Sequence, residues 1–553
     1  MAVVDLASLR AALTAIAEDG LWSVAALDFE LGYLLEPATA PANWSPPTDR
    51  PLARFWRFRQ RIAMDVTEAE EWLAAQDAGQ PAGVGGLAAG IDEKRHAAAV
   101  DRIRDYISAG DCYQVNFTFP LNFEWFGHPA ALYAELRARQ PVRYGGFLGD
   151  DKGGIVSLSP ELFLEKNGER VLTRPMKGTL AREQPAERLQ ASLKDRAENL
   201  MIVDLLRNDL GRVAASGSVQ VEELFAVEDY PTVWQMVSQV SAHVPGVSLG
   251  DILLALFPCG SITGAPKIRA MQIIAELEDQ PRGFYTGAFG WIAPGGDFRL
   301  NVAIRTLELA PDRTGRMGIG SGIVADSTAA SEWQECLLKA GFLRDCDPGL
   351  MLIETLRREA GNYPRLSGHL ARLRNSAAWF GFVCDEALLR QRLDGIPASG
   401  TWRVRLTLGK AGEIDVQAFP LGDEPAFPRL ARLATATIDS ADPLRRHKTT
   451  ARPLYDEALR ALEADSPVFD VLFLNERGEV AEGARSNVFV ERDGRLLTPP
   501  LSSGALPGVL RAELLAGGRA REAVLLPEDL QQHFWLGNAL RGLMPVRLES
   551  PAA

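Results

Sequence analysis

The pattern of helices, strands and turns in this sequence breaks once, around Asp345-Cys346-Asp347-Pro348-Gly349, and a second series of strands begins at Leu350. A chain of 553 residues is longer than a single hydrophobic core supports, so two or more domains are expected. We predict a first domain over residues 1–345 and a second over residues 350–553, each large enough to bury its own core.

Composition narrows the class of protein. Hydrophobic residues make up 46% of the chain and charged residues 24%, as in ordinary soluble globular proteins. The longest apolar runs are too short to span a bilayer and the first residues lack the basic start of an export signal, so we predict a cytoplasmic protein that binds no membrane. A net charge of -13 argues against a nucleic-acid partner, and five scattered cysteines argue against a disulfide framework or a zinc cluster.

The first 90 residues carry no chemical motif. Trp22 to Leu35 alternates like strands, and we interpret the glycine- and alanine-rich stretch Gly79 to Gly90 as a linker. This stretch partly mimics a dinucleotide-binding loop, but the preceding segment is helical rather than a strand. From Asp92 a helix runs to near Gly110, and helices, glycine-rich turns and strands then alternate to Lys339, which predicts an intimate mixture of helices and strands.

Lys177 lies in Leu172-Thr173-Arg174-Pro175-Met176-Lys177-Gly178-Thr179, a pattern typical of a short strand that ends in a turn. Gly178 lets backbone amides approach an anion such as a carboxylate closely. A lysine held there, away from water or beside other cations, loses ammonium character and becomes a nucleophile. Taken alone, the segment is more simply interpreted as carrying a solvated loop lysine.

Two pairs of acidic residues have helical spacing: Asp195 with Glu198, and Glu332 with Glu335. A spacing of three puts both carboxylates of each pair on one helix face. One acid from each helix, together with substrate and water, would suit Mg²⁺, which proteins hold through few carboxylates. A solvated acidic helix face is the alternative for either pair.

Two glycine-rich segments and one arginine complete the chemistry of the first domain. Gly260 to Lys267 resembles a phosphate loop but lacks its Gly-Lys-Ser/Thr ending, so a nucleotide site is not expected. Gly318 to Val324 suits close approach of backbone to an anion. Arg305 can form a two-pronged contact with a carboxylate, or an ordinary ion pair.

In this order, the segments of residues 90–342 closely resemble the chorismate-utilising family. The motifs are Gly110 to Asn116, Ser159-Pro160-Glu161, Arg174 to Thr179, Glu198 to Asp209, Gly260 to Lys267 and Gly320 to Glu335. The resemblance implies an α/β sandwich of two sheets wrapped by helices. It also implies that Mg²⁺ bridges the ring carboxylate of chorismate to Glu198 and Glu335, with Asp195 and Glu332 nearby. Contacts to chorismate would come from Gly178, Thr179, Thr263, Tyr285, Arg305, Gly320 and Gly322.

Within that family, Lys177 separates two activities. Anthranilate synthases usually carry alanine at this position, whereas 4-amino-4-deoxychorismate synthases carry a lysine nucleophile. The implied chemistry has the amine attack C2 of chorismate as the 4-hydroxyl leaves, after which ammonia enters at C4 and expels the lysine. One departure is Gln235, where many members have a histidine; glutamine cannot move protons, which leaves the general acid unassigned. Because no glutaminase motif is visible, a separate glutamine amidotransferase subunit is the expected ammonia source.

The second domain closely resembles the fold-type IV pyridoxal-phosphate enzymes, a family of aminotransferases and 4-amino-4-deoxychorismate lyases. The matching segments are Leu352 to Leu356, His369 to Ala377, His447 to Thr450, Phe469 to Phe489 and Leu506 to Arg511. The resemblance implies that Lys448 carries the cofactor and moves protons, and that Glu482 pairs with the pyridine nitrogen. It places the cofactor phosphate at Arg372, Val509, Leu510, Asn538 and Ala539.

Two departures affect the second domain. The usual first strand before Glu354 is absent, so its small lobe is clipped or is completed by the first domain. Ala451 stands where many relatives have asparagine, and Tyr455 either contacts the cofactor in its place or serves packing. The resemblance also allows a homodimer through this domain.

Fusion favours one combination of activities. A lyase that releases pyruvate from 4-amino-4-deoxychorismate would consume the product of the first domain, so we predict a bifunctional enzyme that makes p-aminobenzoate for folate. The alternatives are an anthranilate synthase fused to an aminotransferase-like domain, and a second domain that serves only as a docking scaffold.

Overall fold

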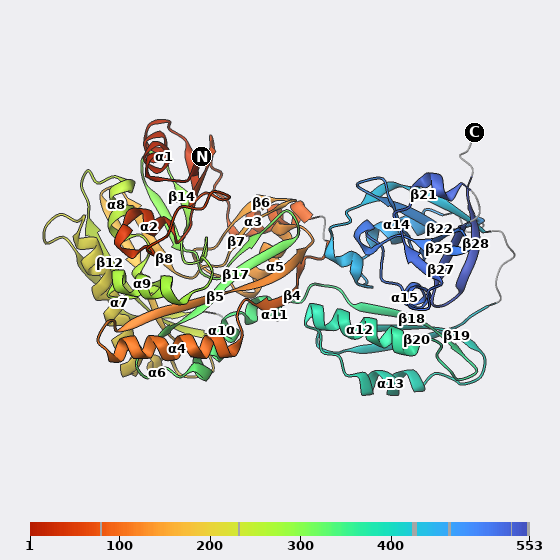
Figure 1. Cartoon of the computed structure of the whole chain (residues 1–553). Helices are drawn as coiled ribbons and strands as arrows, with labels where there is room; N and C mark the ends of the chain where they lie inside the picture. Colours follow the sequence, from red (N-terminus) through yellow and green to blue (C-terminus); the bar gives the residue numbers. More distant parts are fainter. Residues whose placement is uncertain (78–79, 231–232, 423–428, 463–465, 532–533, 550–553) are drawn as a thin grey trace. The chain divides into compact units, whose positions relative to one another are not determined.

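The computed structural model describes residues 1–77, 80–230, 233–422, 429–462, 466–531 and 534–549. The chain divides into two compact units (Figure 1). Unit 1 comprises residues 1–79, 87–123 and 128–346, and unit 2 comprises residues 80–86, 124–127 and 347–553. Among the described residues, no helix is both long enough and apolar enough to cross a membrane.

Unit 1 is built on two sheets. The first has the strand order β1-β3-β2-β14-β15-β8-β9-β12-β10, with β11 paired to β12, and the second has the order β13-β5-β17-β16-β7-β6, with β4 paired to β5. The strands of the first sheet are β1 (Ala2–Val3), β2 (Trp22–Leu27), β3 (Ala53–Phe58), β8 (Leu162–Asn167), β9 (Arg170–Arg174), β10 (Met176–Ala181), β11 (Gln220–Asp229), β12 (Val233–His243), β14 (Ala288–Ile292) and β15 (Phe298–Val302). Those of the second are β4 (Gly83–Ala89), β5 (Gln114–Phe126), β6 (Gly146–Asp150), β7 (Gly153–Ser157), β13 (Gly264–Ala265), β16 (Thr306–Leu309) and β17 (Thr314–Ile323).

Helices surround these sheets (Figure 1). They are α1 (Leu6–Glu18), α2 (Leu31–Leu35), α3 (Val66–Asp77), α4 (Glu93–Ser108), α5 (Pro129–Arg139), α6 (Ala186–Ala191), α7 (Leu193–Gly211), α8 (Leu249–Leu256), α9 (Lys267–Leu277), α10 (Ala329–Lys339) and α11 (Gly341–Arg344). The predicted helix after Asp92 is confirmed as α4: the Asp92 carboxylate caps it by accepting from the Arg95 amide at 2.8 Å, and Gly110 follows its end with a φ of +83°. Val100 and Ile103 are fully buried in the main core of the unit, where each such side chain stabilises the fold by about 1.5–3 kcal/mol.

Two predictions for the N-terminal region were wrong. Within Trp22 to Leu35, only Trp22–Leu27 is a strand, because the carbonyls of Asp28 and Glu30 accept from the amides three residues on and start the short helix α2. The described part of the predicted glycine-rich linker contains strand β4; Gly79 lies outside the described residues. Glycine is needed in β4 because a Cβ at Gly83 would lie 2.7 Å from the Phe126 ring.

Unit 2 contains a small and a large sheet. The small sheet has the order β18-β19-β20, from β18 (Leu352–Glu359), β19 (Thr401–Leu408) and β20 (Ile414–Pro420). The large sheet has the order β23-β22-β21-β28-β27-β24-β25-β26, from β21 (Arg429–Ile438), β22 (Val468–Asn475), β23 (Val480–Gly483), β24 (Asn487–Arg492), β25 (Arg495–Thr498), β26 (Ala520–Glu522), β27 (Phe534–Asn538) and β28 (Gly542–Leu548). The helices are α12 (Leu366–Phe380), α13 (Glu386–Asp394), α14 (Pro453–Arg460) and α15 (Val509–Ala516).

Alternation along the small sheet sets which of its side chains face the core. Leu356, Val404 and Leu406 are buried in one cluster with Leu370 and Leu373 of α12. Because side chains alternate along a strand, Thr355, Arg403 and Arg405 project from the opposite face. This opposite face forms part of the cavity described below.

Candidate active sites

Lys177 lies in an irregular strand, not in the predicted turn. Strand β10 pairs with β12 through Met176 with Val237 and Thr179 with Gln235, and its register shifts between these pairs, at Lys177 and Gly178. Gly178 has a φ of +80°, and a Cβ there would lie 2.9 Å from the Asp195 side chain, so only glycine fits without strain. The bulge places Lys177 beside the Gly260 segment, where its amine donates to the Ser261 carbonyl at 3.2 Å.

Gln235 holds this bulge. Its side-chain amide donates to the Gly178 carbonyl at 2.8 Å, and its side-chain oxygen accepts from the Thr179 hydroxyl at 2.9 Å. Glutamine can offer a donor and an acceptor at once, which matches the two groups of the bulge. The Thr179 hydroxyl is therefore bonded within the protein, and Gln235 holds both residues that follow Lys177.

Glu161 is the acidic group beside Lys177 that sequence reasoning missed. It is 5% exposed, and one of its carboxylate oxygens has no hydrogen-bond partner in the described part of the chain. Burial raises the pKa of the Glu161 carboxyl, while the charge of Lys177 and a hydrogen bond from Ser261 act in the opposite direction. The signal available in the sequence was a carboxylate between Ser159-Pro160 and the apolar strand Leu162–Leu164, a place where a solvated acid is not expected.

Glu198 and Glu335 meet near Lys177, from helices α7 and α10. Desolvation raises the pKa of the Glu198 carboxyl, Lys194 and Lys177 lower it, and the charges of Asp195 and Glu335 raise it further. Glu335 itself pairs with Lys339 at 2.8 Å. Glu332 is buried on the same helix. Among the described residues, no cluster of three or more histidine, cysteine or acidic side chains could hold a metal.

Arg305 is a half-buried cation whose side chain has no hydrogen-bond or ion-pair partner in the described part of the chain. Desolvation lowers the pKa of its guanidinium, whereas the neighbouring Tyr230 and Tyr285 raise it. Its backbone has a φ of +49°, a conformation that non-glycine residues rarely adopt, and its carbonyl accepts from the Leu158 amide at 2.9 Å. A half-buried guanidinium without a protein partner is suited to receive an anionic ligand.

The other residues of unit 1 that we predicted to contact chorismate make contacts within the protein itself. The Thr263 hydroxyl donates to the Gly260 carbonyl at 3.1 Å, and the Tyr285 ring packs under Gly318, where a Cβ would lie 2.1 Å from it. A Cβ at Gly320 would lie 2.4 Å from the Phe117 carbonyl, and one at Gly322 would lie 2.3 Å from the Gln114 side chain. Close approach of strand β5 therefore already requires both glycines.

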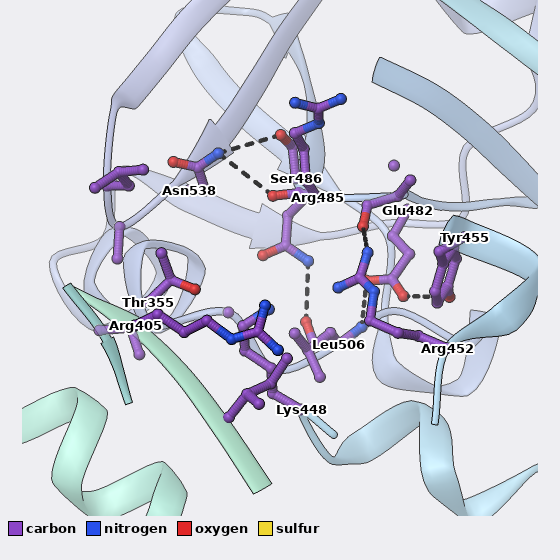
Figure 2. A pocket seen from close by; sticks show the side chains of 18 of the residues that line it. Thr355, Arg405, Lys448, Arg452, Tyr455, Glu482, Arg485, Ser486, Leu506 and Asn538 are labelled. Atoms are coloured by element: carbon purple, nitrogen blue, oxygen red, sulfur yellow. Dashed lines mark hydrogen bonds between the residues drawn. The ribbon is translucent and has the colours of Figure 1, made fainter. Parts of the chain in front are cut away.

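The predicted cofactor residues of unit 2 line one cavity of about 700 Å³. Arg372, Lys448, Glu482, Val509, Asn538 and Ala539 all line it. Figure 2 shows Lys448, Glu482 and Asn538 around this cavity. Leu510 does not; its side chain is buried in a cluster with Phe489 and Leu514. The Lys448 carbonyl accepts a hydrogen bond from the amide of Ile353, near the start of β18, at 2.9 Å. This bond fixes the position of the Lys448 backbone.

Lys448 and Glu482 have complementary electrostatics. Burial lowers the pKa of the Lys448 amine to about 8, aided by the charges of Arg452 and Arg372. Glu482 accepts from the Tyr455 hydroxyl at 2.6 Å and from the Leu506 amide at 2.9 Å, while burial raises the pKa of its carboxyl. Tyr455 therefore orients Glu482, a role that was not predicted from the sequence.

The donors near α15 suit a phosphate. Gly508 begins this helix with no side-chain cap, so the amides of its first turn are available to an anion. Arg372 lies beside them, held by the Glu354 carboxylate at 2.6 Å and 2.8 Å and by the Pro507 carbonyl at 3.3 Å. A nucleophilic lysine, a buried carboxylate and an uncapped helix start in one cavity fit pyridoxal phosphate.

The sequence of residues 3–345 matches the family model of chorismate binding enzymes. This chain belongs to the chorismate-binding enzyme family. Residues 351–548 match the family model of class IV amino-transferases. The predicted fold class, a chorismate-binding domain followed by a fold-type IV domain, is confirmed by these two matches.

Relatives of this family member carry two related names. Aminodeoxychorismate synthase component 1 of Klebsiella aerogenes is 42% identical over 275 residues, which are 48% of this chain and 61% of that protein. Anthranilate synthase component 1 of Thermus thermophilus is 40% identical over 300 residues, which are 50% of this chain and 64% of that protein. The chain therefore spans less than two thirds of the length of these relatives. The crystal structure of a putative amino-acid aminotransferase from Mesorhizobium loti shares 43% identity, covers 36% of this chain and 100% of its own, and has a TM-score of 0.34.

Proposed function

We propose that this chorismate-binding enzyme makes p-aminobenzoate in two reactions. Unit 1 would replace the 4-hydroxyl of chorismate by an amino group, and unit 2 would release pyruvate from the resulting 4-amino-4-deoxychorismate. The observation that carries the proposal is the Lys177 amine beside the buried Glu161, in a chain that also carries Lys448 and Glu482 in one cavity. Ammonia would come from a separate glutamine amidotransferase subunit, and the pathway served would be that of folate.

Lys177 and Glu161 can divide the first reaction between them. The amine would attack C2 of the ring, and Glu161, whose pKa is raised by burial, would give a proton to the departing 4-hydroxyl, so that water leaves. Ammonia would then form the bond at C4 as the bond from C2 to Lys177 breaks. Arg305 would hold a carboxylate of chorismate, and Glu198 and Glu335 would hold Mg²⁺, which supplies positive charge to the ring carboxylate.

In unit 2, pyridoxal phosphate would supply the electron sink for the second reaction. Lys448 would carry the cofactor and then, once freed by the substrate amine, remove the ring proton. Glu482, oriented by Tyr455, would face the pyridine nitrogen, and Arg372 with the start of α15 would hold the phosphate.

Product identification tests the whole proposal. Purified protein is incubated with chorismate, Mg²⁺, ammonium and pyridoxal phosphate, and the products are separated by chromatography with mass detection. p-Aminobenzoate together with pyruvate supports both reactions. Accumulated 4-amino-4-deoxychorismate would leave unit 2 without lyase activity, and anthranilate would favour the other activity named among the relatives.

Replacing Glu161 with glutamine is expected to slow formation of 4-amino-4-deoxychorismate by roughly 10²- to 10⁴-fold, because the amide cannot give a proton to the leaving hydroxyl. The rate is measured with saturating ammonium. Glu165→Gln is the matched control, since Glu165 lies on strand β8, which begins directly after Glu161, but pairs with Arg299 at the surface. Equal rates for the Glu161 variant and the wild type would show that Glu161 is not the proton donor.

Uptake of pyridoxal phosphate is expected to depend on pH through Lys448. Only the neutral amine attacks the cofactor aldehyde, and the pKa of Lys448 lies at about 8. In protein freed of cofactor, the uptake rate should rise about tenfold per pH unit below that value and level off above it. Stopped-flow absorbance measures the rate; a rise that continues to the pKa of an ordinary lysine would contradict the role of burial.

A further inference from the structure

The cavity of unit 2 carries more positive charge than a cofactor phosphate needs. Seven arginines line it, at positions 372, 403, 405, 445, 452, 485 and 541, against the acidic side chains of Asp456 and Glu482. Arg372 pairs with Glu354, Arg445 with Asp442 at 3.3 Å and Arg452 with Asp456 at 2.9 Å. Within the described part of the chain, Arg403, Arg405 and Arg485 form no ion pair; we call these three the arginine triplet.

The triplet comes from two different sheets. Arg405 lies opposite Thr355 in the register of β19 with β18, and Arg403 lies two residues away on the same strand face. Arg485 precedes β24 of the large sheet. Figure 2 shows the Arg405 side chain extending from the small sheet into the cavity near Lys448, with Arg485 and Ser486 on the large-sheet side. A ligand between the two sheets would therefore meet guanidinium groups from both.

The protein supplies little counter-charge to the triplet. Arg403 stacks over the Phe419 ring at 4.9 Å and Arg485 over the Phe469 ring at 5.2 Å, contacts that position a guanidinium without neutralising it. Burial raises the pKa of Asp470, the acid beside Arg485, to about 7. Desolvation and the charges of Arg452, Arg541 and Arg403 lower the pKa of Arg485, although Asp470 acts in the opposite direction. The like charges are thus close enough to repel one another when no anion is bound.

The phosphate donors at Arg372 and the start of α15 come from other elements of the fold than the triplet, although Asn538 donates to the Arg485 carbonyl at 3.3 Å. Arg372 belongs to α12 and donates to Pro507 just before α15, whereas Arg403 and Arg405 belong to β19 and Arg485 to the segment between β23 and β24. The triplet is therefore available for carboxylates of the substrate itself. An amino-acid substrate of an aminotransferase has a single α-carboxylate, which one arginine satisfies in a two-pronged contact.

We propose that the arginine triplet selects a substrate with two separated carboxylates, one bound from the small sheet by Arg405 and Arg403 and the other from the large sheet by Arg485. This inference rests on the proposed lyase function and specifies its substrate class: a cyclic amine that bears a ring carboxylate and an ether-linked carboxylate. An arrangement of this kind favours the lyase over an amino-acid aminotransferase.

Calorimetric titration of the cofactor-loaded full chain tests the inference. The probe is 3-(carboxymethoxy)benzoate, which carries a ring carboxylate and an ether-linked carboxylate, and it is compared with 3-methoxybenzoate, which has one carboxylate. Because unit 1 can also bind the probe, the result is the difference between the wild type and each variant. Arg405→Gln and Arg485→Gln should each weaken dicarboxylate binding by roughly ten- to a hundredfold. Arg357→Gln is the matched control, since Arg357 lies in the same sheet and pairs with Glu359 at 3.1 Å.

The outcomes separate this inference from the proposed function. Conversion of chorismate to 4-amino-4-deoxychorismate at the wild-type rate shows that a variant is folded in unit 1, and retention of the cofactor's visible absorbance shows that its unit 2 cavity is intact. Dicarboxylate binding unchanged by both variants would overturn the inference, as would equal affinity for the monocarboxylate or for inorganic phosphate. Wild-type protein that binds the dicarboxylate through Arg405 but makes no p-aminobenzoate would instead refute the lyase and leave the ligand class standing.

Discussion

Replacing Lys177 with alanine is expected to lower formation of 4-amino-4-deoxychorismate by more than about 10³-fold, because the variant has no amine to attack C2 of chorismate. Ammonia can then enter only at C2, and the product is expected to shift toward anthranilate. Chromatography of the products from chorismate, Mg²⁺ and ammonium measures both changes in one experiment.

The control for Lys177 is Lys152→Ala, which removes an exposed lysine in the turn between β6 and β7 and should leave the rate unchanged. Binding of chorismate should survive the Lys177 substitution, since Arg305, Glu198 and Glu335 remain. Undiminished 4-amino-4-deoxychorismate from the alanine variant would exclude covalent catalysis by Lys177 and return the first reaction to direct attack by ammonia.

Replacing Lys448 with alanine is expected to abolish p-aminobenzoate formation, with a loss of more than about 10³-fold, while 4-amino-4-deoxychorismate accumulates at the wild-type rate. The reason is that Lys448 both holds the cofactor and removes the ring proton, and no second lysine lines the cavity in the described part of the chain. Borohydride treatment of the wild type should fix pyridoxal on the peptide that contains Lys448.

Lys448→Arg separates the roles of charge and amine. Arginine keeps a positive charge in the cavity opposite the carboxylates of Glu354 and Glu482. It cannot, however, form the covalent link to the cofactor. This variant should therefore be as inactive as the alanine variant, yet retain the stability of the wild type in thermal unfolding. If the arginine variant still makes p-aminobenzoate, unit 2 acts by chemistry other than that proposed, and a scaffold role is favoured if neither the wild type nor the variant takes up the cofactor.

Several residues of the candidate sites could be predicted from sequence because their roles depend on local order. Lys177, Gly178 and Gln235 stand in recognisable motifs, and the spacing of Glu198 and Glu335 puts them on helix faces. Lys448 and Glu482 were likewise found by motif. The sequence also predicted that Gly260 to Lys267 is no nucleotide loop; Lys267 instead donates to Asp209 at 2.7 Å and anchors this segment to α7.

The functions of other residues depend on neighbours that are far away in the chain. Gly320 and Gly322 suggested an approach to a ligand, whereas strand β5 already requires their missing side chains. In the sequence, Gln235 stood out only because it replaces a histidine that could carry protons. Its hydrogen bond to the bulge of β10 follows from the pairing of β10 with β12. Pairing between distant strands leaves no periodic signal in a single sequence.

The amino-acid sequence by itself predicted two domains, both family resemblances and the two candidate lysines, because motif order and hydrophobic periodicity are local properties. Only the tertiary structure identified Glu161 as the buried acid beside Lys177, because the residue type alone does not tell whether a glutamate is solvated or buried. The arginine triplet was equally invisible, because Arg403, Arg405 and Arg485 meet only when two sheets are brought to one cavity. Burial and the distance between charges set how strongly these groups act on a ligand, and both are properties of the folded chain.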